Sequence, residues 1–578
     1  MAPTWAFAPA MTTPFVLLDD VRAGGTAWLY RDPTEIVAAH NPGEVRPCLA
    51  RLRGRHAAGF IAYEAGYALE PKLAPLAAAP PQSEPPLLWF GLFDRAERVD
   101  AAALLPDGAG AWAGRPRPMV EQSAYRAAAE RVLEHIRAGD VYQANLTFQA
   151  QVKVAGSPLA LYAGLRTRAS AGHSALVFTG EHWILSLSPE LFFTLSGGRV
   201  ETRPMKGTAP ASAEDSALRR DPKQRAENLM IVDLIRNDLS RVSTPGTVKA
   251  PTLFAVERYP TVLQMTSTVT AELEPGRDAI DLVEAIFPCG SITGAPKIRA
   301  MEIVHGLEAG PRGIYCGAVG GVAPDGEAAF NVAIRTLVLR DGDSIARLGL
   351  GSGIVADSRA QEEWRECLAK GAFVTDQRRF DLIETMAFDP HDGIGDLDRH
   401  LARMKRSAEA LEFPFDRHVA RNELQAATFR AGASQIRLLL SRSGAMAIEL
   451  RPLPEQPAEP VEVAVAPLPV APDDFRLAHK TSDRAFYDEA RAAAGTFEIV
   501  FHDRAGFLTE GSFTHLFVER GGRLLTPPLS RGLLPGILRE RLIEEGRAKE
   551  ADLTLADLGA GFLIGNAVRD LIRAKIAR

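Results

Sequence analysis

The fold of the first part of the chain is decided by residues 174–204, SALVFTGEHWILSLSPELFFTLSGGRVETRP. Short apolar runs alternate here with turn residues such as Thr179-Gly180 and Gly197-Gly198. This spacing is typical of consecutive antiparallel hairpins. We therefore predict four strands, at Ala175–Phe178, Trp183–Ser188, Leu191–Leu195 and Arg199–Thr202.

Helices are predicted on both sides of this β-rich stretch. Ser123 is a candidate N-cap for a helix that continues through Arg137, with Gly139 as its stop. Two longer helices are predicted, at about 221–239 and about 358–373. Residues 71–118 are rich in Ala, Pro and Gly, so we expect a loop or an embellishment there.

The pattern resets after a short polar stretch at Asp376–Arg379. A β-like run, Phe380–Phe388, is followed by an amphipathic helix in which Leu397, Leu401, Met404, Ala408 and Leu411 recur at helical spacing. With 578 residues, the chain is too long for one core. We predict an N-terminal part at 1–120, a catalytic core at 121–377 and a separate domain at 380–578.

Composition excludes several classes of function. Lys plus Arg number 66 against 72 Asp plus Glu, a formal net charge of −6, so a broad nucleic-acid-binding face is not expected. Four scattered cysteines do not suit a disulfide framework or a zinc cluster. Because neither a secretory signal nor a membrane span is recognisable, we expect a soluble, cytoplasmic protein with no membrane association.

Carboxylates on two of the predicted helices suggest a site for a hard cation. Glu363, Glu366 and Lys370 lie at i, i+3 and i+7 and so share one helix face, while Glu227 lies on the other long helix. Such an oxygen-rich arrangement suits Mg²⁺. From spacing alone, a solvated face with weak ion pairs explains the same residues. The glycines of Gly349–Gly353 could also bring backbone N–H groups close to a carboxylate ligand.

Ordered motifs over about 230 residues resemble the chorismate-utilising enzymes, specifically the aminodeoxychorismate synthase component I family. The matching stretches are Gly139–Leu146, Ser188-Pro-Glu190, Arg203–Thr208, Glu227–Asp238, Gly290–Lys297, Arg312–Gly317, Phe330–Arg335 and Gly351–Asp357. The resemblance implies an α+β domain of two stacked antiparallel sheets flanked by helices. The first 120 residues match less clearly.

The resemblance also implies ligands for this domain. Glu227, Glu363 and Glu366 would hold Mg²⁺, which would bind a carboxylate of chorismate. A further family carboxylate is Gln224 here, which leaves the outer contacts of the metal open. The implied substrate-binding positions are Thr293, Tyr315, Arg335, Gly351, Gly353 and Lys370. Arg335 and Lys370 suit a dianionic substrate on charge alone.

Lys206 separates the branches of this family. The resemblance assigns Lys at this position to aminodeoxychorismate synthases and Ala to anthranilate synthases. Lys206 would attack the chorismate ring as the 4-hydroxyl leaves, Glu190 would act as acid and base, and ammonia would then displace the lysine.

Gln264 stands where anthranilate synthases carry a His used in pyruvate elimination. The first domain is therefore expected to aminate chorismate without eliminating pyruvate. The alternative is a purely structural role, in which Lys206 forms an ion pair with an acidic residue near a turn.

The ammonia donor is not recognisable in the chain. Because no glutaminase signature is visible, we expect ammonia to come from a separate glutamine amidotransferase subunit, or from free ammonia at high concentration.

The segment after residue 380 resembles the class IV pyridoxal-phosphate enzymes, which include aminodeoxychorismate lyase and branched-chain aminotransferase. The landmarks are Glu384–Met386, Leu397–Arg403, His479–Arg484, Leu508–Thr514, Thr526–Leu529 and Gly532–Ile537. The resemblance implies a two-subdomain α/β fold with pyridoxal 5′-phosphate between the subdomains. Lys480 would carry the cofactor and move protons, and Glu510 would face the pyridine nitrogen. Arg403 and the backbone at Ile537 and Leu538 would hold the phosphate.

Together the two resemblances imply synthesis of 4-aminobenzoate for folate. Chorismate would be aminated to 4-amino-4-deoxychorismate, and pyruvate would then be eliminated. The stretch Gly565–Arg569 looks lyase-like but is short, so two alternatives stay open: a fused branched-chain-like aminotransferase, or an anthranilate-type synthase. A homodimer through the C-terminal domain is expected by analogy, whereas channelling and a regulatory amino-acid site stay undecided.

Overall fold

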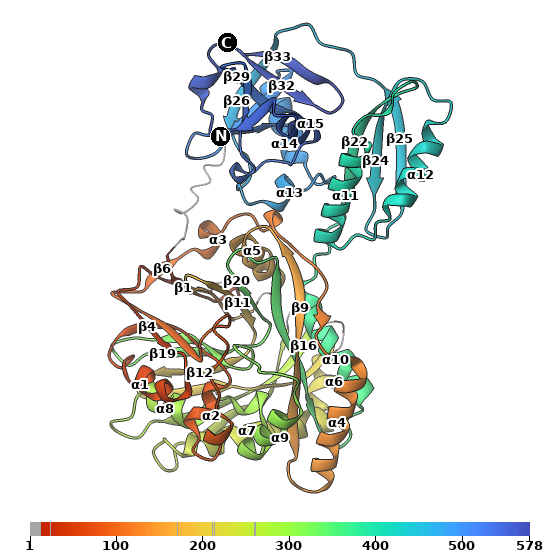
Figure 1. Cartoon of the computed structure of the whole chain (residues 1–578). Helices are drawn as coiled ribbons and strands as arrows, with labels where there is room; N and C mark the ends of the chain where they lie inside the picture. Colours follow the sequence, from red (N-terminus) through yellow and green to blue (C-terminus); the bar gives the residue numbers. More distant parts are fainter. Residues whose placement is uncertain are drawn as a thin grey trace. The chain divides into compact units, whose positions relative to one another are not determined.

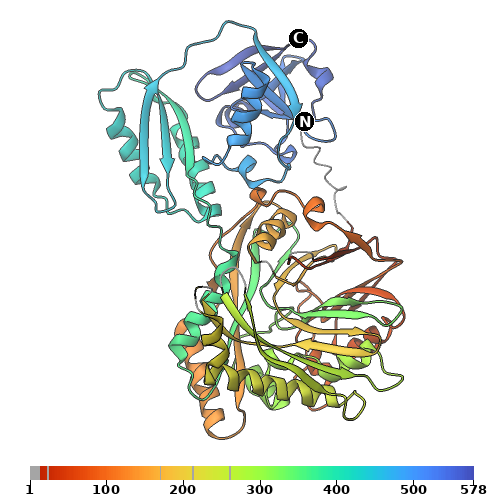
Figure 2. The same ribbon diagram turned by 180° about the vertical axis from the view of Figure 1, so that it is seen from behind.

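The computed structural model describes residues 13–22, 25–169, 171–210, 212, 214–258 and 262–577. The chain forms two compact units (Figures 1 and 2). The first comprises residues up to Leu105, Arg115–Lys153 and Tyr162–Thr375. The second comprises Asp376 to the end of the chain together with two earlier segments, Pro106–Gly114 and Val154–Leu161. Across the described residues, no helix combines the length and the apolar character that crossing a membrane requires.

The first unit is built on two antiparallel sheets. In spatial order, one sheet contains β17 (Gly294–Ala295), β9 (Gln143–Ala155), β21 (Ile345–Ile354), β20 (Thr336–Arg340), β11 (His182–Ser188), β10 (His173–Phe178), β1 (Phe15–Asp19), β2 (Ala27–Arg31) and β6 (Glu97–Val99), with β8 (Arg117–Pro118) on β9. The other contains β14 (Met205–Pro210), β16 (Val262–Glu272), β13 (Arg199–Arg203), β12 (Leu191–Ser196), β19 (Ala328–Val332), β18 (Ala318–Val322), β4 (His56–Ile61), β5 (Leu88–Phe93) and β3 (Glu35–Ala39), with β15 (Lys249–Arg258) on β16.

The two sheets stack through a shared apolar layer. Val16 and Val177 from the first sheet belong to the same buried cluster as Phe60 and Val319 from the second. Since successive strand residues point to opposite faces, each sheet can bury one face here and cover the other with helices. The helices of the unit are α1 (Val45–Ala50), α2 (Ala65–Leu69), α3 (Ala101–Leu104), α4 (Gln122–Arg137), α5 (Pro158–Ala169), α6 (Asp215–Arg220), α7 (Pro222–Ser240), α8 (Ala279–Ile286), α9 (Lys297–Leu307) and α10 (Ala360–Gly371).

Two of these helices bring the predicted acidic residues to the sheets. The long helix α7 contacts β14 and β16, as seen along the lower part of Figure 2, and α10 contacts β21 and α4. Asp221 caps α7 by accepting hydrogen bonds from the backbone N–H groups of Lys223 and Gln224. Pro222 occupies the first turn, where its missing N–H costs nothing.

The second unit contains two further sheets. The smaller has the order β23 (Gly393–Ile394), β22 (Leu382–Asp389), β24 (Ser434–Leu440) and β25 (Met446–Pro452), with α11 (Leu397–Leu411) and α12 (Arg417–Thr428) beside it (Figure 1). The larger runs β28 (Leu508–Gly511), β27 (Glu498–His502), β26 (Val461–Pro467), β33 (Asp570–Ile576), β32 (Phe562–Asn566), β29 (His515–Arg520), β30 (Arg523–Thr526) and β31 (Ala548–Glu550). Its helices are α13 (Phe475–Ala478), α14 (Ala485–Ala494) and α15 (Ile537–Glu544).

The expected fold class is confirmed, and one local prediction was wrong. The four predicted hairpin strands are β10 to β13, and the predicted helices are α4, α7, α10 and α11, with ends that differ by one to a few residues. Residues 71–118, however, are not one loop, because Leu88–Phe93 forms a fully buried strand between β3 and β4. The apolar run LWFGLF carries that strand, and the surrounding Ala and Pro residues obscured it in the composition.

Candidate active sites

The first candidate site lies where β14 and the end of β11 meet. Glu190 follows β11 in a turn in which its backbone N–H donates to the Ser188 hydroxyl, and that hydroxyl donates to the carbonyl of Val332 at 2.6 Å. Glu190 is buried, and its Oε1 has no hydrogen-bond partner among the described residues. A buried carboxyl oxygen without a protein partner is available to a bound molecule.

Lys206 and Gln143 face the same small space beside Gly353. A Cβ on Gly353 would lie 2.8 Å from Lys206 Nζ and 3.0 Å from Gln143 Nε2, so a side chain there would displace both groups. Gln143 is fully buried, and neither its amide nitrogen nor its amide oxygen has a described partner. The structure therefore places an amine beside an amide that has no partner among the described residues, and the amine acts electrostatically on a carboxyl with one such oxygen.

Electrostatics favour proton transfer at this site. Burial lowers the pKa of Lys206, and the positive charge of Lys370 lowers it further, while Glu227, Glu366 and Glu190 oppose the shift. Burial raises the pKa of Glu190 to about 7, against a hydrogen bond from Ser291 and the charge of Lys206. A lysine that loses its proton readily and a carboxyl that keeps its own are suited to act as nucleophile and acid.

The predicted metal ligands face this site but are not gathered into a closed set. Glu366 forms an ion pair with Lys370 at 2.7 Å, and Glu363 accepts a hydrogen bond from Ser358 at 2.6 Å. Burial raises the pKa of Glu227, and the negative charge of Glu366 adds to this rise. No group of three acidic, His or Cys side chains close enough to hold a metal ion occurs among the described residues.

Gly351 and Gly353 lie near the C-terminal end of β21, and Lys370 contacts the first of them. Lys370 Nζ donates to the carbonyl of Gly351 at 3.0 Å, and a Cβ on Gly351 would lie 2.7 Å from Thr147. Thr293 is buried, and its hydroxyl hydrogen-bonds to the carbonyls of Cys289 and Gly290. Arg335 has a left-handed backbone, with φ 50°, and its carbonyl accepts from the Leu187 N–H.

Tyr315 borders a different space. Together with Gly349 and Arg312 it lines a cavity of about 440 Å³ whose walls include neither Lys206 nor Glu190. Arg312 pairs with Glu308 and donates to the carbonyls of Asn145 and Ile292, which lie next to the first site along the chain. The structure therefore places Tyr315 on a cavity that Lys206 and Glu190 do not line.

The second candidate site is centred on Lys480. Its Nζ donates to the Thr385 hydroxyl at 3.1 Å, and its backbone carbonyl accepts from the Ile383 N–H at 2.8 Å. Burial, together with the charge of Arg403, lowers the pKa of Lys480 to about 7. A large share of Lys480 is therefore neutral near pH 7, the form that can attack a carbonyl carbon.

Arg403 lies beside the N-terminus of α15. It makes two hydrogen bonds to Glu384, at 2.8 and 2.6 Å, and a third to the carbonyl of Pro535 at 3.0 Å. Pro535 directly precedes Gly536, the N-cap of α15, so the guanidinium and the amides of Ile537 and Leu538 lie on neighbouring parts of the chain. A cation beside the N-terminus of a helix is suited to a phosphate group.

Glu510 lies at the end of β28 with two aromatic neighbours. The Tyr487 hydroxyl donates to its Oε1 at 2.6 Å, and His515 Nδ1 lies 3.8 Å from its Oε2. Burial raises the pKa of Glu510 to about 7, and the bond from Tyr487 opposes this rise. Burial lowers the pKa of His515 to about 3, with the charges of Arg539, Arg403 and Lys480 lowering it further. His515 is therefore neutral at pH 7.

The structure reveals the importance of two residues, one inside a quoted motif and one just after another. Gln143 lies within the quoted stretch Gly139–Leu146, and Tyr487 follows Lys480 by seven residues on α14. Nothing in their spacing distinguishes them from core residues. Their significance comes from a buried amide without partners and from a short bond to Glu510.

Known proteins match both parts of the chain. Residues 25–376 match the family described as chorismate binding enzyme, and residues 381–576 match the family described as amino-transferase class IV. The chain is 45% identical over 258 residues to anthranilate synthase component 1 of Streptomyces coelicolor, which covers 43% of this chain and 50% of that protein. It is 43% identical over 242 residues to aminodeoxychorismate synthase component 1 of Salmonella typhimurium, covering 41% and 53%.

These alignments span only about half the length of the curated relatives, at 50% and 53%. The solved structure of anthranilate synthase component I from Streptococcus pneumoniae has the same fold as the first unit, with a TM-score of 0.53 at 23% identity, over 65% of this chain and 95% of that one. The chain therefore belongs to the chorismate-binding enzyme family, and a class IV aminotransferase domain follows within the same polypeptide.

Proposed function

We propose that the chain converts chorismate and ammonia into 4-aminobenzoate and pyruvate in two steps. The first unit would replace the 4-hydroxyl of chorismate by an amino group, and the second would eliminate pyruvate from 4-amino-4-deoxychorismate. The observation that carries the first step is Lys206 Nζ beside Gly353, with its charge acting on Glu190, whose Oε1 has no hydrogen-bond partner among the described residues.

In the first step, Lys206 acts as nucleophile. Its neutral amine forms a bond to the ring while the 4-hydroxyl leaves as water, taking the proton held by Glu190. Ammonia then attacks C4, the C–N bond to Lys206 breaks with its electron pair returning to the amine, and a proton from the incoming nitrogen returns to Glu190. The net change is replacement of hydroxyl by amine with release of one water.

Mg²⁺ is proposed at Glu227, Glu363 and Glu366. Oxygen donors suit this ion, and the pKa of Glu227 is raised by burial and by the negative charges of Asp357 and Glu366, which a cation would offset. Bound Mg²⁺ would supply positive charge for a carboxylate of chorismate. Glu366 would have to exchange its ion pair with Lys370 for the metal, which leaves Lys370 free for the substrate.

Lys206 and Gln264 favour amination over anthranilate formation. Gln264 donates its amide N–H to the carbonyl of Gly207 at 2.9 Å, next to the nucleophile. An amide at this position holds backbone and cannot exchange a proton in the way a histidine can. Sequence similarity does not decide between the branches, because relatives with both names match this chain at similar identity.

In the second step, Lys480, Glu510 and Arg403 are proposed to hold pyridoxal 5′-phosphate. The fit rests on the neutral lysine, on the cation at the helix N-terminus and on Gly536, where a Cβ would lie 1.8 Å from His515 Nε2. The cofactor supplies an electron sink for the carbanion left when a proton departs. Lys480 would take the proton from the ring carbon of the substrate. The Glu510 carboxylate, whose charged form the Tyr487 hydroxyl favours, would face the pyridine nitrogen of the cofactor and keep it protonated.

Ammonia is proposed to arrive from a separate glutamine amidotransferase. Relatives of the first unit are named component 1, which fits a second component that releases ammonia. A homodimer formed through the second unit is the proposed oligomeric state.

Product analysis tests the whole proposal. The purified chain is mixed with chorismate, Mg²⁺, pyridoxal phosphate and a high concentration of ammonium, and products are separated by chromatography. We expect 4-aminobenzoate and pyruvate in equal amounts. Accumulation of 4-amino-4-deoxychorismate would instead assign the second unit to another class IV reaction such as amino-acid transamination, and anthranilate would overturn the role of Lys206.

Replacing Lys206 by Ala should reduce ammonium-dependent consumption of chorismate by more than about 1,000-fold, because the nucleophile is lost. The exposed Lys249 on β15 offers a matched control, and Lys249→Ala should leave the rate unchanged. Retained amination in Lys206→Ala would remove this lysine from the mechanism.

Amination should slow as the pH rises through about 7, because Glu190 must be protonated to assist the leaving hydroxyl and its pKa lies near that value. The rate is measured at constant concentration of unprotonated ammonia, so that the donor does not vary. Glu190→Gln should lower the rate by about 100-fold or more and remove this limb. A limb that persists in Glu190→Gln would belong to another group.

Borohydride reduction in the presence of pyridoxal phosphate should attach the cofactor to Lys480, as detected by peptide mass mapping. The neutral amine is the reactive form, so attachment should rise with pH through about 7. Lys480→Ala should prevent attachment, whereas Lys549→Ala, at an exposed lysine of β31, should not. Attachment elsewhere with Lys480 unmodified would contradict the assignment.

A further inference from the structure

A segment from the middle of the chorismate-binding match completes the second unit. Pro106–Gly114 lies within residues 25–376, yet it clusters with Asp376–Arg578. Trp112 on β7 (Trp112–Ala113) is fully buried in the core of the second unit, in one cluster with Phe380, Leu411 and Phe475. The guanidinium of Arg442 lies 5.3 Å above its ring. We call residues 106–114 the inserted loop.

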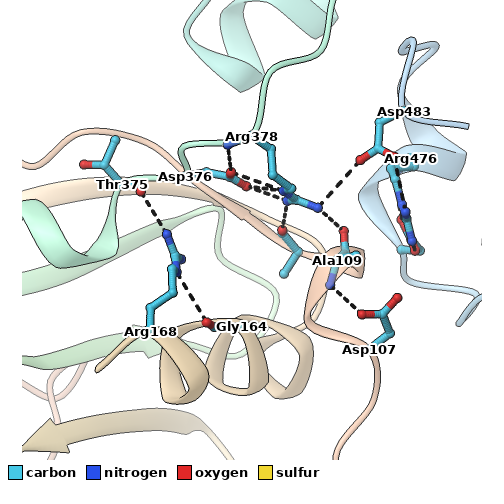
Figure 3. A network of polar contacts seen from close by, with 11 residues as sticks. Asp107, Ala109, Gly164, Arg168, Thr375, Asp376, Arg378, Arg476 and Asp483 are labelled. Carbon is cyan, nitrogen blue, oxygen red and sulfur yellow. Dashed lines mark hydrogen bonds and ion pairs between the residues drawn. The ribbon is translucent and has the colours of Figure 1, made fainter. Parts of the chain in front are cut away.

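Arg378 ties the inserted loop to the chain that leads into β22 (Figure 3). It donates to the carbonyl of Ala109 at 2.6 Å and to that of Ala111, and it pairs with Asp376. The backbone N–H of Asp376 donates in turn to the carbonyl of Ala113 at 2.9 Å. Because a guanidinium is a rigid fork of donors, one side chain can fix two carbonyls and a carboxylate at once.

The same arginine reaches the segment that carries Lys480. Its Nη1 lies 3.7 Å from Asp483, three residues after the lysine, and its guanidinium lies 5.4 Å above the ring of Phe475. Arg476 approaches the other oxygen of Asp483 at 3.6 Å and pairs with Asp474, the N-cap of α13 (Figure 3). Arg378 is therefore bonded on one side to the inserted loop and lies on the other against residues that flank Lys480.

The segment that carries Lys480 pairs with the segment that follows Arg378. The Ile383 N–H donates to the Lys480 carbonyl, and the Ser482 N–H donates to the Asp381 carbonyl at 2.8 Å. Ser482 also receives the Asp381 N–H on its hydroxyl at 2.9 Å. Asp381 lies three residues and Ile383 five residues after Arg378, so the segment that Arg378 anchors is the one whose backbone pairs with that of Lys480 and Ser482.

We propose that Arg378 is a positioning residue for Lys480, and that it acts by fixing the segments 376–383 and 480–483 against the inserted loop. This inference rests on the proposed role of Lys480 in holding pyridoxal phosphate. It adds that the second active site depends on residues encoded more than 260 positions before it, inside the chorismate-binding match.

The test measures the amine of Lys480 itself, without cofactor. The full chain is labelled with a trace of an acetylating reagent over a range of pH, and acetylation of Lys480 is quantified by mass spectrometry. In Arg378→Gln the two segments separate and water reaches the amine, so the midpoint of labelling should rise towards that of an exposed lysine. Arg378→Lys keeps the charge near Asp376 and Asp483 but cannot bridge two carbonyls, and should lie between.

Arg531→Gln provides the matched control. Arg531 is a similarly half-buried arginine of the same unit, bonded to Asp503 and Asp552, and its loss should lower thermal stability without moving the midpoint of Lys480. In the cofactor-loaded enzyme, Arg378→Gln should lower kcat of the second step by up to about 100-fold, as small misplacements do, with amination of chorismate unchanged.

An unchanged labelling midpoint in folded Arg378→Gln or Arg378→Lys would overturn the inference. If Lys480 of the unsubstituted chain fails to bind pyridoxal phosphate, the proposed function of the second unit fails, and the labelling midpoint still reports whether Arg378 positions the lysine. Equal shifts in Arg531→Gln and Arg378→Gln would show general loosening of the unit and would also overturn the inference.

Discussion

Both sites depend on taking a lysine amine out of water. An ammonium ion loses much of its hydration on burial, and the protein lowers this cost by letting the amine release its proton. Lys206 and Lys480 are shifted in the same direction for the same first cause, although they lie on unrelated folds. In each case a second cation, Lys370 or Arg403, adds to the effect of burial. The rest of each site is arranged around an amine whose pKa is lowered by burial.

Each lysine is accompanied by a buried carboxyl with the opposite shift. The pKa values of Glu190 and Glu510 are both raised to about 7 by burial. Their surroundings then separate their roles. Glu190 keeps one oxygen without a described partner, which suits a group that exchanges a proton with a ligand. Glu510 receives a short bond from Tyr487, which favours its charged form and suits a group that holds a charge in place.

Much of this organisation could be predicted from the sequence, because its signals are local. Alternating apolar runs with turn residues marked β10 to β13, and the ordered motifs indicated the chorismate-binding family. The strand Leu88–Phe93 was missed because Ala and Pro around it dominate the composition. The significance of Gln143 and Arg378 could not be read from the sequence, since it arises from contacts with residues far along the chain. The positions of Glu227, Glu363 and Glu366 relative to one another could not be predicted either, because sequence spacing predicts only which residues share a helix face.

The burial of Trp112 has a consequence for how the protein is made. A ribosome completes Gly114 some 262 residues before Asp376, and at about 5–20 residues per second this interval lasts roughly 13–50 s. Throughout that time the indole has no core to enter, because its partners Phe380, Leu411 and Phe475 do not yet exist. The core of the second unit is therefore incomplete until Trp112, which is synthesised much earlier, packs into it. The nascent chain has to keep a short apolar segment available until its last third emerges.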